Sequence, residues 1–511
     1  MRTSVLVAVL SLIPMSFAHA QIPTAEREAL IALYNSTDGA NWSNKSNWMG
    51  DEGTECTWFG VSCGAGHVTE LVLNSNNLDG SLPAELGDLP SLFLLHMWAN
   101  QLTGSLPPEL GKLTQLQQIK LSNNQLSGSI PPELGDLSWM SWLELYNNEL
   151  TGSIPPELGG MSNLQMMQLT GNQLSGSIPP QLGDLSSLTY LHLQANQLIG
   201  NIPPELGKLS NLYSLQLYLN QLSGSIPPEL GDLSGLAILY LHLNQLSGSI
   251  PPELGKLSSL QKLYLYSNKL SGDIPAELED LSALLVGELR IKWNALHSDD
   301  ASLVAFLDSK FPGGWQSTQT IAPVNLSFDR VGDHTVWLNW DAVSYQIDPG
   351  GYEVFSAPTG TGVWTSGGWT EPKTSNTFPI TGLDPGTIYD LAVLTYTAPH
   401  TDNPNLVHSD FSTLVMATTV SGGCAQPIIE HAGEDPITLS LSASWDSYLW
   451  STGETTSSIN VDPQLWRWYW VTVTSSGSCE ETATTWVGPA IPLFTDGFES
   501  GNTSEWSSAA P

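Results

Sequence analysis

A unit of about 24 residues recurs almost without interruption between residues 68 and 296, and self-similarity at such a period is typical of a solenoid. The residues around the centre of the unit read L-x-x-L-x-L-x-x-N-x-L and are followed by a close variant of S-G-S-I-P-P-E-L-G. The clearest marker is the asparagine, which recurs once per unit at constant spacing until the last one comes two positions late: Asn76, Asn100, Asn124, Asn148, Asn172, Asn196, Asn220, Asn244, Asn268 and Asn294.

One unit cannot fold alone. Its roughly six leucine or isoleucine side chains contribute about 1.5–3 kcal/mol each when buried, whereas ordering the backbone costs about 1–2 kcal/mol per residue. Stacking of neighbouring coils is therefore obligatory. We expect each asparagine amide to satisfy backbone groups at a bend of the coil, so that replacing one with alanine would cost about 1–3 kcal/mol for each stranded group.

These repeats resemble the plant-type leucine-rich repeat, whose unit ends in L-x-G-x-I-P. The resemblance implies an α/β solenoid of about ten coils over residues 67–296, with a parallel sheet on its concave face. Ten strands at ~4.8 Å spacing would give a face roughly 45 Å long.

Both ends of such a solenoid expose apolar side chains and need a cover. Residues 21–66 hold a predicted helix at 25–34, Trp42, Trp48 and a close cysteine pair, and they resemble the N-terminal cap of plant leucine-rich repeat receptors. Residues 297–321 are predicted to form a C-terminal cap, with a helix at 300–310, and a linker.

The remainder of the chain predicts all-β immunoglobulin-like and fibronectin type III sandwich modules. Residues 322–419 resemble a fibronectin type III domain, with alternating strands and a tyrosine-corner pattern at Tyr389. Residues 420–489 resemble a small immunoglobulin-like module of secreted bacterial proteins. The tail, 490–511, resembles a C-terminal sequence of exported bacterial proteins, and is either a sorting tag or a last strand.

Residues 1–20 have the features of a secretory signal peptide: Arg2, an apolar run, and the cleavage pattern at 18–20. The alternative is an uncleaved membrane anchor. No other stretch of the sequence stays apolar over the roughly 18 residues that a spanning helix needs, so no membrane span is predicted. We expect a secreted protein, free or held at a cell surface. In such a compartment the four cysteines, which lie as two pairs in separate regions, predict two disulfides, Cys56–Cys63 and Cys424–Cys479.

The chain is strongly acidic, with 15 Lys and Arg against 50 Asp and Glu and a net charge of −35. This balance argues against nucleic acid and anionic membranes as partners. No histidine or cysteine cluster has metal-ligand spacing, and H-E-x-x-H and P-loop motifs are absent from the sequence. We therefore predict a non-enzymatic protein without a cofactor or metal.

Within each unit, the residue between the last two leucines and the residue after them are predicted to point outward from the concave sheet. These positions, with their neighbours, are unusually rich in Trp, Tyr and His, side chains that often anchor binding surfaces. The alternative is that the rings merely stabilise the sheet as cross-strand pairs. The predicted ligand-binding residues are His96, Trp98, Trp142, Tyr146, Tyr190, His192, Tyr213, Tyr218, Tyr240, His242, Tyr264, Tyr266, Arg290, Lys292 and Trp293.

Charge is uneven along these units. Lys262, Arg290 and Lys292 gather at the C-terminal end of the predicted face and indicate either a pocket for an acidic group or neutralisation by Glu288. A second row, after each Glu-Leu-Gly and after the last Glu-Leu-Glu, predicts lateral ion pairs between adjacent coils: Asp88, Lys112, Asp136, Gly160 (uncharged), Asp184, Lys208, Asp232, Lys256 and Asp280.

The leading hypothesis is a secreted or surface-associated recognition and adhesion protein whose concave face binds a protein or peptide. A glycan-binding adhesin for polysaccharide is the alternative, because stacked aromatic side chains beside His and Gln also suit sugars. An extracellular enzyme with an unrecognised active site ranks below both.

Overall fold

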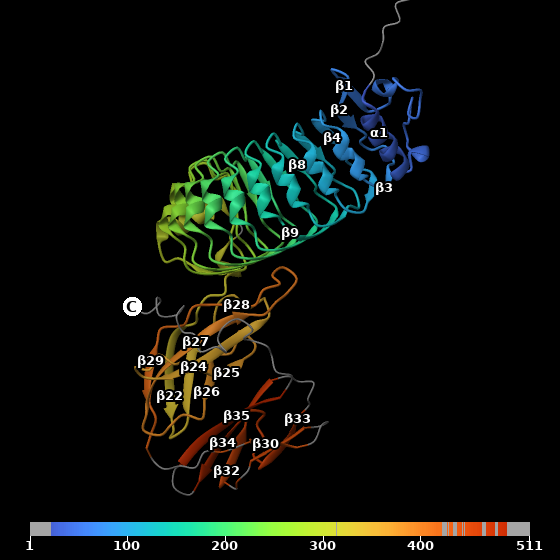
Figure 1. Cartoon of the computed structure of the whole chain (residues 1–511). Coiled ribbons are helices and arrows are strands. Elements are labelled where there is room, and N and C mark those ends of the chain that lie inside the picture. The colour runs from blue at the N-terminus through green and yellow to red at the C-terminus, as the bar shows by residue number, and fades with distance from the viewer. Residues whose placement is uncertain are drawn as a thin grey trace, which may run out of the picture.

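The computed structural model describes residues 22–487 except 313, 422–426, 428, 433–436, 442, 444, 462–466 and 476–478. The predicted signal peptide, the tail and Cys424, with its predicted pairing to Cys479, lie outside these residues. A curved solenoid is followed by two β-rich modules at its C-terminal end (Figure 1). No helix among the described residues is long and apolar enough to cross a membrane.

The concave face is one sheet of eleven strands. β1 runs antiparallel to β2, and the others follow at one strand per coil in parallel register. Two further rows of short elements, a second row of parallel strands and a series of 3-10 turns, complete each coil. In the second row of strands, β7 to β21 form one eight-stranded sheet, and β3 pairs with β5. The concave strands are β1 (Val61–Gly64), β2 (His67–Val72), β4 (Leu94–His96), β6 (Gln118–Lys120), β8 (Trp142–Glu144), β10 (Met166–Gln168), β12 (Tyr190–His192), β14 (Ser214–Gln216), β16 (Ile238–Tyr240), β18 (Lys262–Tyr264) and β20 (Leu289–Arg290).

The asparagine ladder joins adjacent coils. Asn124 accepts a hydrogen bond from the Leu102 N–H at 3.0 Å, and its amide donates to the Met97 and Leu121 carbonyls, both at 3.0 Å. The same three bonds recur at Asn148, whose side chain is buried. The predicted role of the ladder is therefore confirmed, and each amide ties its own coil to the preceding one.

After the ladder the chain enters the second row of strands and then a 3-10 turn. The strands of the second row are β3 (Asp79–Ser81), β5 (Gln101–Thr103), β7 (Ser127–Gly128), β9 (Glu149–Ser153), β11 (Gln173–Gly176), β13 (Gln197–Gly200), β15 (Gln221–Gly224), β17 (Gln245–Gly248), β19 (Lys269–Asp273) and β21 (Ala295–His297). The 3-10 turns are Ala84–Asp88, Pro108–Lys112, Pro132–Asp136, Pro156–Gly160, Pro180–Asp184, Pro204–Lys208, Pro228–Asp232, Pro252–Lys256 and Ala276–Asp280.

Close stacking of the turns explains the glycine of each Glu-Leu-Gly. A Cβ on Gly135 would lie 2.2 Å from the Glu157 carbonyl oxygen of the next coil. The charged row beyond these glycines does not form the predicted lateral ion pairs. Within the described residues, none of its members lies within 4.0 Å of an opposite charge, and the exposed side chains of Lys112 and Asp136 extend into solvent, where pairing gains little.

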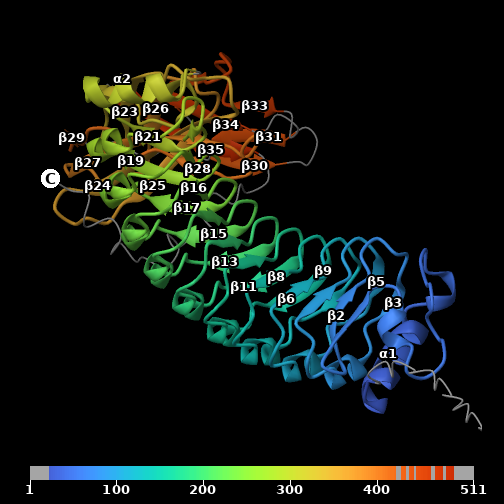
Figure 2. The same ribbon diagram turned by 90° about the horizontal axis from the view of Figure 1, so that it is seen from above.

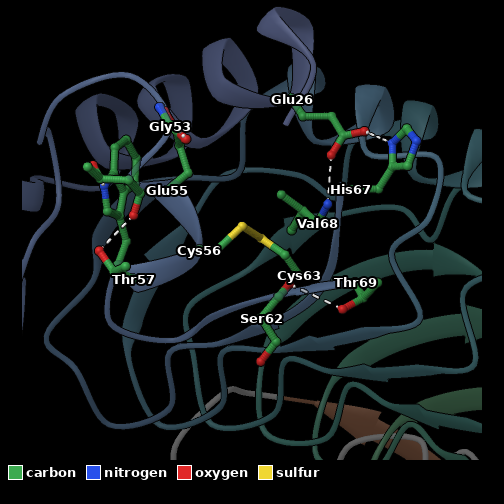
Figure 3. Close-up of a disulfide and its surroundings, with 12 residues drawn as sticks. Glu26, Gly53, Glu55, Cys56, Thr57, Ser62, Cys63, His67, Val68 and Thr69 are labelled. Carbon is green, nitrogen blue, oxygen red and sulfur yellow. Dashed lines mark hydrogen bonds and ion pairs between the residues drawn. A yellow bond between two sulfur atoms is a disulfide. The ribbon is translucent and has the colours of Figure 1, made fainter. Parts of the chain in front are cut away.

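The N-terminal cap is held by buried charge and a disulfide (Figure 3). Helix α1 (Thr24–Ser36) places Glu26 against β2, where its carboxylate accepts from the Val68 N–H at 2.7 Å and meets His67 Nδ1 at 2.5 Å. Cys56 and Cys63 form the predicted disulfide. Three short 3-10 turns complete the N- and C-terminal caps: Gly39–Asn41, Glu55–Thr57 and Gln316–Thr318.

Aromatic side chains seal the first coil beneath this cap. Trp42 and Trp48 pack edge to face at 4.8 Å, and Trp58 lies 4.9 Å from Trp48. All three are buried and join the leucine core of the solenoid. They are therefore structural side chains rather than parts of a ligand surface.

The other end is covered by α2 (Ala301–Lys310). Asp300 caps this helix by accepting from the Ser302 and Leu303 N–H groups, as is usual for an aspartate at this position. Leu303 and Leu307 are buried against the last coils, and the Lys310 ammonium donates to the Leu284 carbonyl at 2.6 Å.

A β-sandwich follows. Its two sheets have the orders β22-β23-β26 and β25-β24-β27-β28, with β29 also pairing β27. The predicted tyrosine corner is present, because the Asp384 N–H donates to the Tyr389 hydroxyl at 3.0 Å. The strands are β22 (Val324–Val331), β23 (Val336–Asp341), β24 (Gly350–Pro358), β25 (Thr365–Thr370), β26 (Thr377–Ile380), β27 (Ile388–Thr397), β28 (Val407–His408) and β29 (Val415–Thr418).

The last described module has two three-stranded sheets, β30-β31-β33 and β32-β34-β35. It is attached to the preceding sandwich through Glu481, a buried carboxylate that accepts from the Asp333 N–H at 2.7 Å and the Thr335 hydroxyl at 3.0 Å. The strands are β30 (Ile429–Ala432), β31 (Ile437–Leu441), β32 (Ser447–Trp450), β33 (Ser458–Val461), β34 (Arg467–Ser475) and β35 (Cys479–Val487).

Candidate functional site: the concave face

The short strands present three columns of side chains on the concave face. The middle residue of each strand is buried in the leucine core, whereas the residues on either side are partly exposed, as in Gln118, Ile119 and Lys120. The pleat of the sheet causes this alternation. A third column comes from the second residue after each strand, such as Ser122 after β6 and Tyr146 after β8.

In the C-terminal half the rings form two stacked rows. Tyr240 and Tyr264 are stacked with ring centroids 4.2 Å apart in the column that ends the strands. In the next column, His242 lies between Tyr218 and Tyr266, 4.3 Å from each and nearly parallel to both. The two rows also contact each other edge to face, since Tyr240 and His242 are 5.8 Å apart.

A smaller cluster adjoins these rows. Tyr190 contacts Tyr213 at 5.8 Å and His192 at 5.9 Å. His192 Nε2 lies 3.1 Å from the Ser214 hydroxyl, and its Nδ1 lies 3.4 Å from the Gln168 amide nitrogen. The predicted residues Tyr190, His192 and Tyr213 thus lie together, although Tyr213 comes from the edge before β14.

The N-terminal half has a different arrangement. Within the described residues, no ring contact joins Trp98, Trp142 and Tyr146. Trp142 is covered by the Lys120 ammonium, 3.9 Å from its ring centroid, and Lys120 also pairs with Glu144 at 3.2 Å. His96, instead of stacking, has its Nε2 3.1 Å from the Gln118 side-chain oxygen. The sequence prediction grouped these residues with the C-terminal rings, but they are separate from them.

Burial keeps the concave imidazoles neutral. Loss of solvent lowers the pKa of His192 to about 4. Burial, and then the nearby Arg290 guanidinium, lower the pKa of His242 to about 4. Burial and Lys120 also lower the pKa of His96. At neutral pH each of these rings is therefore an uncharged aromatic surface with one donor and one acceptor nitrogen.

Two buried polar atoms on this face have no hydrogen-bond partner within the described structure: Gln194 Oε1 and His242 Nδ1. They flank Tyr218 in the same column, one coil to either side. A buried polar atom without a partner costs about 1–3 kcal/mol. Gln194 was not among the predicted site residues, because a glutamine at one concave position carries no distinguishing signal in the sequence.

The cations at the C-terminal end divide into two kinds. Glu288 lies 3.7 Å from the Lys262 ammonium and accepts from the Tyr264 hydroxyl at 2.5 Å, so Lys262 is neutralised. Arg290 stacks over the Tyr264 ring at 4.5 Å and Lys292 lies 5.0 Å from the Phe311 ring. Within the described residues, neither Arg290 nor Lys292 has a carboxylate within 4.0 Å. Trp293 continues the aromatic row, 6.2 Å from Tyr266.

Family models account for the coils, the cap and the first sandwich. The leucine-rich repeat region model matches residues 168–310, and the leucine-rich repeat model matches 67–89, 115–137 and 140–161. The leucine-rich repeat N-terminal domain model matches 23–64, and the fibronectin type III domain model matches 321–406. The chain is a leucine-rich repeat protein with a fibronectin type III domain.

Solved structures similar to this leucine-rich repeat protein include plant receptor ectodomains. One is the leucine-rich repeat ectodomain of the membrane receptor kinase GASSHO1/SCHENGEN3 from Arabidopsis thaliana, in complex with CASPARIAN STRIP INTEGRITY FACTOR 2. It is 36% identical with a TM-score of 0.51, and the match covers 53% of this chain and 36% of that chain. The leucine-rich repeat protein therefore spans about a third of that ectodomain's length.

Two further solved structures are similar to parts of this chain. The Arabidopsis receptor kinase HAESA, in complex with the peptide hormone IDA and a co-receptor, is 32% identical with a TM-score of 0.43, covering 54% of this chain and 50% of that chain. A plant ice-binding protein is 27% identical with a TM-score of 0.42, and the match covers 53% of this chain and 98% of that chain. The solenoid resembles plant receptor ectodomains, which is consistent with protein or peptide binding, and its domain types are typically non-catalytic.

Proposed function

We propose that this leucine-rich repeat protein acts outside the cell, without catalytic activity, and binds an extended protein or peptide segment on its concave face. The stacked rows of Tyr218, Tyr240, His242, Tyr264 and Tyr266 carry this proposal. Folding explains the leucines and the asparagine ladder, but it does not require aromatic side chains at these outward positions. Rigid, partly exposed rings are the side chains that dominate the free energy of binding at protein interfaces.

Cross-strand stacking alone does not account for the surface. Tyr240 and Tyr264 are direct neighbours in the parallel register, so their contact also stabilises the sheet. However, Gln194 Oε1 and His242 Nδ1 are left without partners beside the same rings, within the part of the chain that the structure describes. Stacking provides no partner for these two enclosed atoms and so does not explain them. The partly exposed tyrosine rings would hold the side chains of an extended peptide.

The unpaired cations extend this proposal to the charge of the ligand. Arg290 and Lys292 lie at the end of the ring rows in a chain with a net charge of −35. An acidic group on the ligand would find there two cations that the described protein leaves without a carboxylate. The similar GASSHO1/SCHENGEN3 ectodomain, solved with a bound partner, supports recognition by this repeat type.

The test uses a phage-displayed library of random linear peptides of about 14 residues, the length that spans ~45 Å when extended at ~3.3 Å per residue. We expect the full chain to enrich peptides whose affinity falls at least roughly 100-fold in the triple variant Tyr218→Ala, Tyr240→Ala and Tyr264→Ala. Trp139→Ala is the matched control, because Trp139 is 58% exposed on the same solenoid but lies outside the strands.

Thermal unfolding followed by circular dichroism checks that the triple variant is folded, and the single variants Tyr218→Ser and Tyr240→Ser replace it if it is not. Peptides that bind these variants as tightly as the parent chain would overturn the concave site. A chain that enriches no peptide but retains polysaccharides on a glycan array would overturn the proposed ligand class.

A further inference from the structure

The fibronectin type III domain is docked on the solenoid by buried asparagines. The Asn405 amide donates to the Asn244 carbonyl at 2.7 Å and to the Ser267 carbonyl at 3.2 Å. Asn403 donates to the Trp293 carbonyl at 3.3 Å, and the Ser267 hydroxyl donates to the Asp402 carbonyl at 2.8 Å. Asn403, Asn405 and Ser267 are all buried. One loop of the fibronectin domain thus contacts three successive coils.

A second group of buried contacts fixes the same joint. The Thr320 and Thr397 hydroxyls are 2.6 Å apart, and the Lys373 ammonium donates to Thr397 at 2.7 Å. All three side chains are buried. Of these, the Thr320–Thr397 contact crosses the joint, because the Thr320 N–H also donates to the Asn294 carbonyl of the solenoid at 2.7 Å, whereas Lys373 and Thr397 both belong to the fibronectin domain. In this orientation, two segments of the fibronectin domain, around Thr397 and around Asn405, lie at the end of the solenoid.

This orientation brings a loop of the sandwich to the end of the ring rows. Residues 342–349 connect β23 to β24, and the Tyr345 side chain in this loop lies close to the side chains of Trp293 and Asp348. Trp293 in turn contacts Tyr266 of the concave face. The aromatic row therefore runs from Tyr218 and His242 to Trp293, and Tyr345 lies close to its end. Seen from above, the β-rich modules lie at the C-terminal end of the arc, on the side toward which the concave strands face (Figure 2).

We propose that residues 342–349 of the fibronectin type III domain form the end wall of the ligand groove and bind an apolar side chain of the same peptide. This inference rests on the proposed function of the concave face. Ile347, in the middle of the loop, is 87% exposed, the highest value among the large apolar side chains of the described chain. Ile347 lies two residues after Tyr345, whose side chain is close to Trp293 at the end of the ring rows.

The spacing of the coils fits one continuous ligand segment. From the coil of Tyr218 to that of Trp293 there are three strand intervals, or about 14 Å at ~4.8 Å each. An extended peptide covers this distance with about four to five residues at ~3.3 Å per residue. A peptide whose residues contact Tyr218 and His242 would therefore reach the coil of Trp293 within the next few residues, without a turn.

The experiment places a photoreactive benzoylphenylalanine at Ile347 of the full chain and, as the matched control, at Val363. Val363 is 61% exposed in the same domain, on the loop between β24 and β25. The probe is a fluorescent peptide enriched from the random library on the parent chain. We expect cross-linking at Ile347 to exceed that at Val363 at least roughly tenfold, and Ile347→Asp to weaken binding of the peptide about tenfold.

The outcomes separate the two proposals. A peptide that depends on Tyr218 and Tyr240 but cross-links equally at Ile347 and Val363, with unchanged affinity for Ile347→Asp, would make the fibronectin domain a spacer and leave the concave site standing. Failure to enrich any peptide, or peptides insensitive to the concave rings, would overturn the proposed function and the end wall with it.

Discussion

The N-terminal and C-terminal halves of the concave face share one scaffold but differ in how their aromatic side chains meet. Trp98, 39% exposed, and Trp142, covered by Lys120, each stand apart from other rings of the described structure. Tyr218, His242 and Tyr266 instead lie in a stack with centroid distances of 4.3 Å. The backbone register is the same in both halves, so the repeat itself does not impose the stacking.

This difference distinguishes the residues that the fold requires from the outward-facing residues, which are available for binding. In both halves the coils are closed by the same leucines and the same asparagine bonds, and the outward positions can vary without affecting them. The stacked half is also the half that adjoins the docked fibronectin domain. Rings, unpartnered polar atoms and unpaired cations of the described chain therefore gather where two domains meet, a common place for binding sites.

The largest expected effect is on stability, and it tests whether the asparagine ladder stabilises the two halves of the solenoid equally. Asn148 and Asn220 are both buried, and each makes three hydrogen bonds of 3.0–3.1 Å to backbone groups of its own and the preceding coil. We expect Asn148→Ala and Asn220→Ala each to lower the free energy of unfolding by about 3 kcal/mol, because several buried groups lose their partners. Urea titration of each variant measures the cost.

The control is Gln115→Ala, an exposed side chain on the same solenoid, for which no measurable change is expected. If the losses of unfolding free energy in Asn148→Ala and Asn220→Ala differed by more than about 1 kcal/mol, the asparagine bonds would not stabilise the two halves equally. The two halves would then differ in the stability of their backbone scaffold and not only in the side chains of the concave face.

The sequence predicted the scaffold well because the repeat supplies its own internal comparison. The period located the coils, the ladder asparagines and the outward positions, and the grouping of the cysteines in two separate regions predicted the Cys56–Cys63 disulfide. The Asp and Lys row misled, because opposite charges on adjacent coils suggested pairs that exposed side chains such as Lys112 do not form.

The joint could not be predicted from the sequence. Asn403 and Asn405 have the composition of an ordinary loop, and Asn405 lies 161 and 138 residues from its partners Asn244 and Ser267. No periodicity links such positions, since the contact depends on how two separately folded domains fit together. For the same reason, nothing in the sequence connected Tyr345 with Trp293.

The next effect is the dependence of folding stability on pH. Folded His192 and His242 have pKa values of about 4, whereas an unfolded histidine titrates near 6.5. Between these values the unfolded chain binds more protons, so stability falls as the pH falls from about 6.5 to 4, by up to about 1.4 kcal/mol per pH unit for each histidine. Above about pH 6.5 the two groups contribute no slope.

We expect His192→Gln with His242→Gln to flatten this part of the stability curve, measured by urea titration between pH 4 and 7. His96→Gln, in the N-terminal half, should change the slope less, because burial lowers the pKa of His96 less far. The parent chain, the double variant and His96→Gln are compared by the slope of the free energy of unfolding against pH. Equal slopes in these three proteins would show that the stacked half does not bury its imidazoles more deeply than the other half.

The smallest effect distinguishes the cations of the two halves. Arg290 over Tyr264 and Lys120 over Trp142 make similar cation–π contacts, each expected to stabilise the fold by about 0.5–1 kcal/mol at a partly exposed site. Of the two cations, Lys120 also has a carboxylate partner, Glu144.

Because the cation–π contacts are similar, Arg290→Gln and Lys120→Gln should change stability by similar small amounts. Because only Lys120 has a carboxylate partner, only Arg290→Gln should weaken binding of enriched peptides that contain Asp or Glu. Equal affinity losses in both variants, compared by fluorescence anisotropy at two salt concentrations, would mean that Arg290 acts through the general charge of the face and not through an unpaired guanidinium at the end of the ring rows.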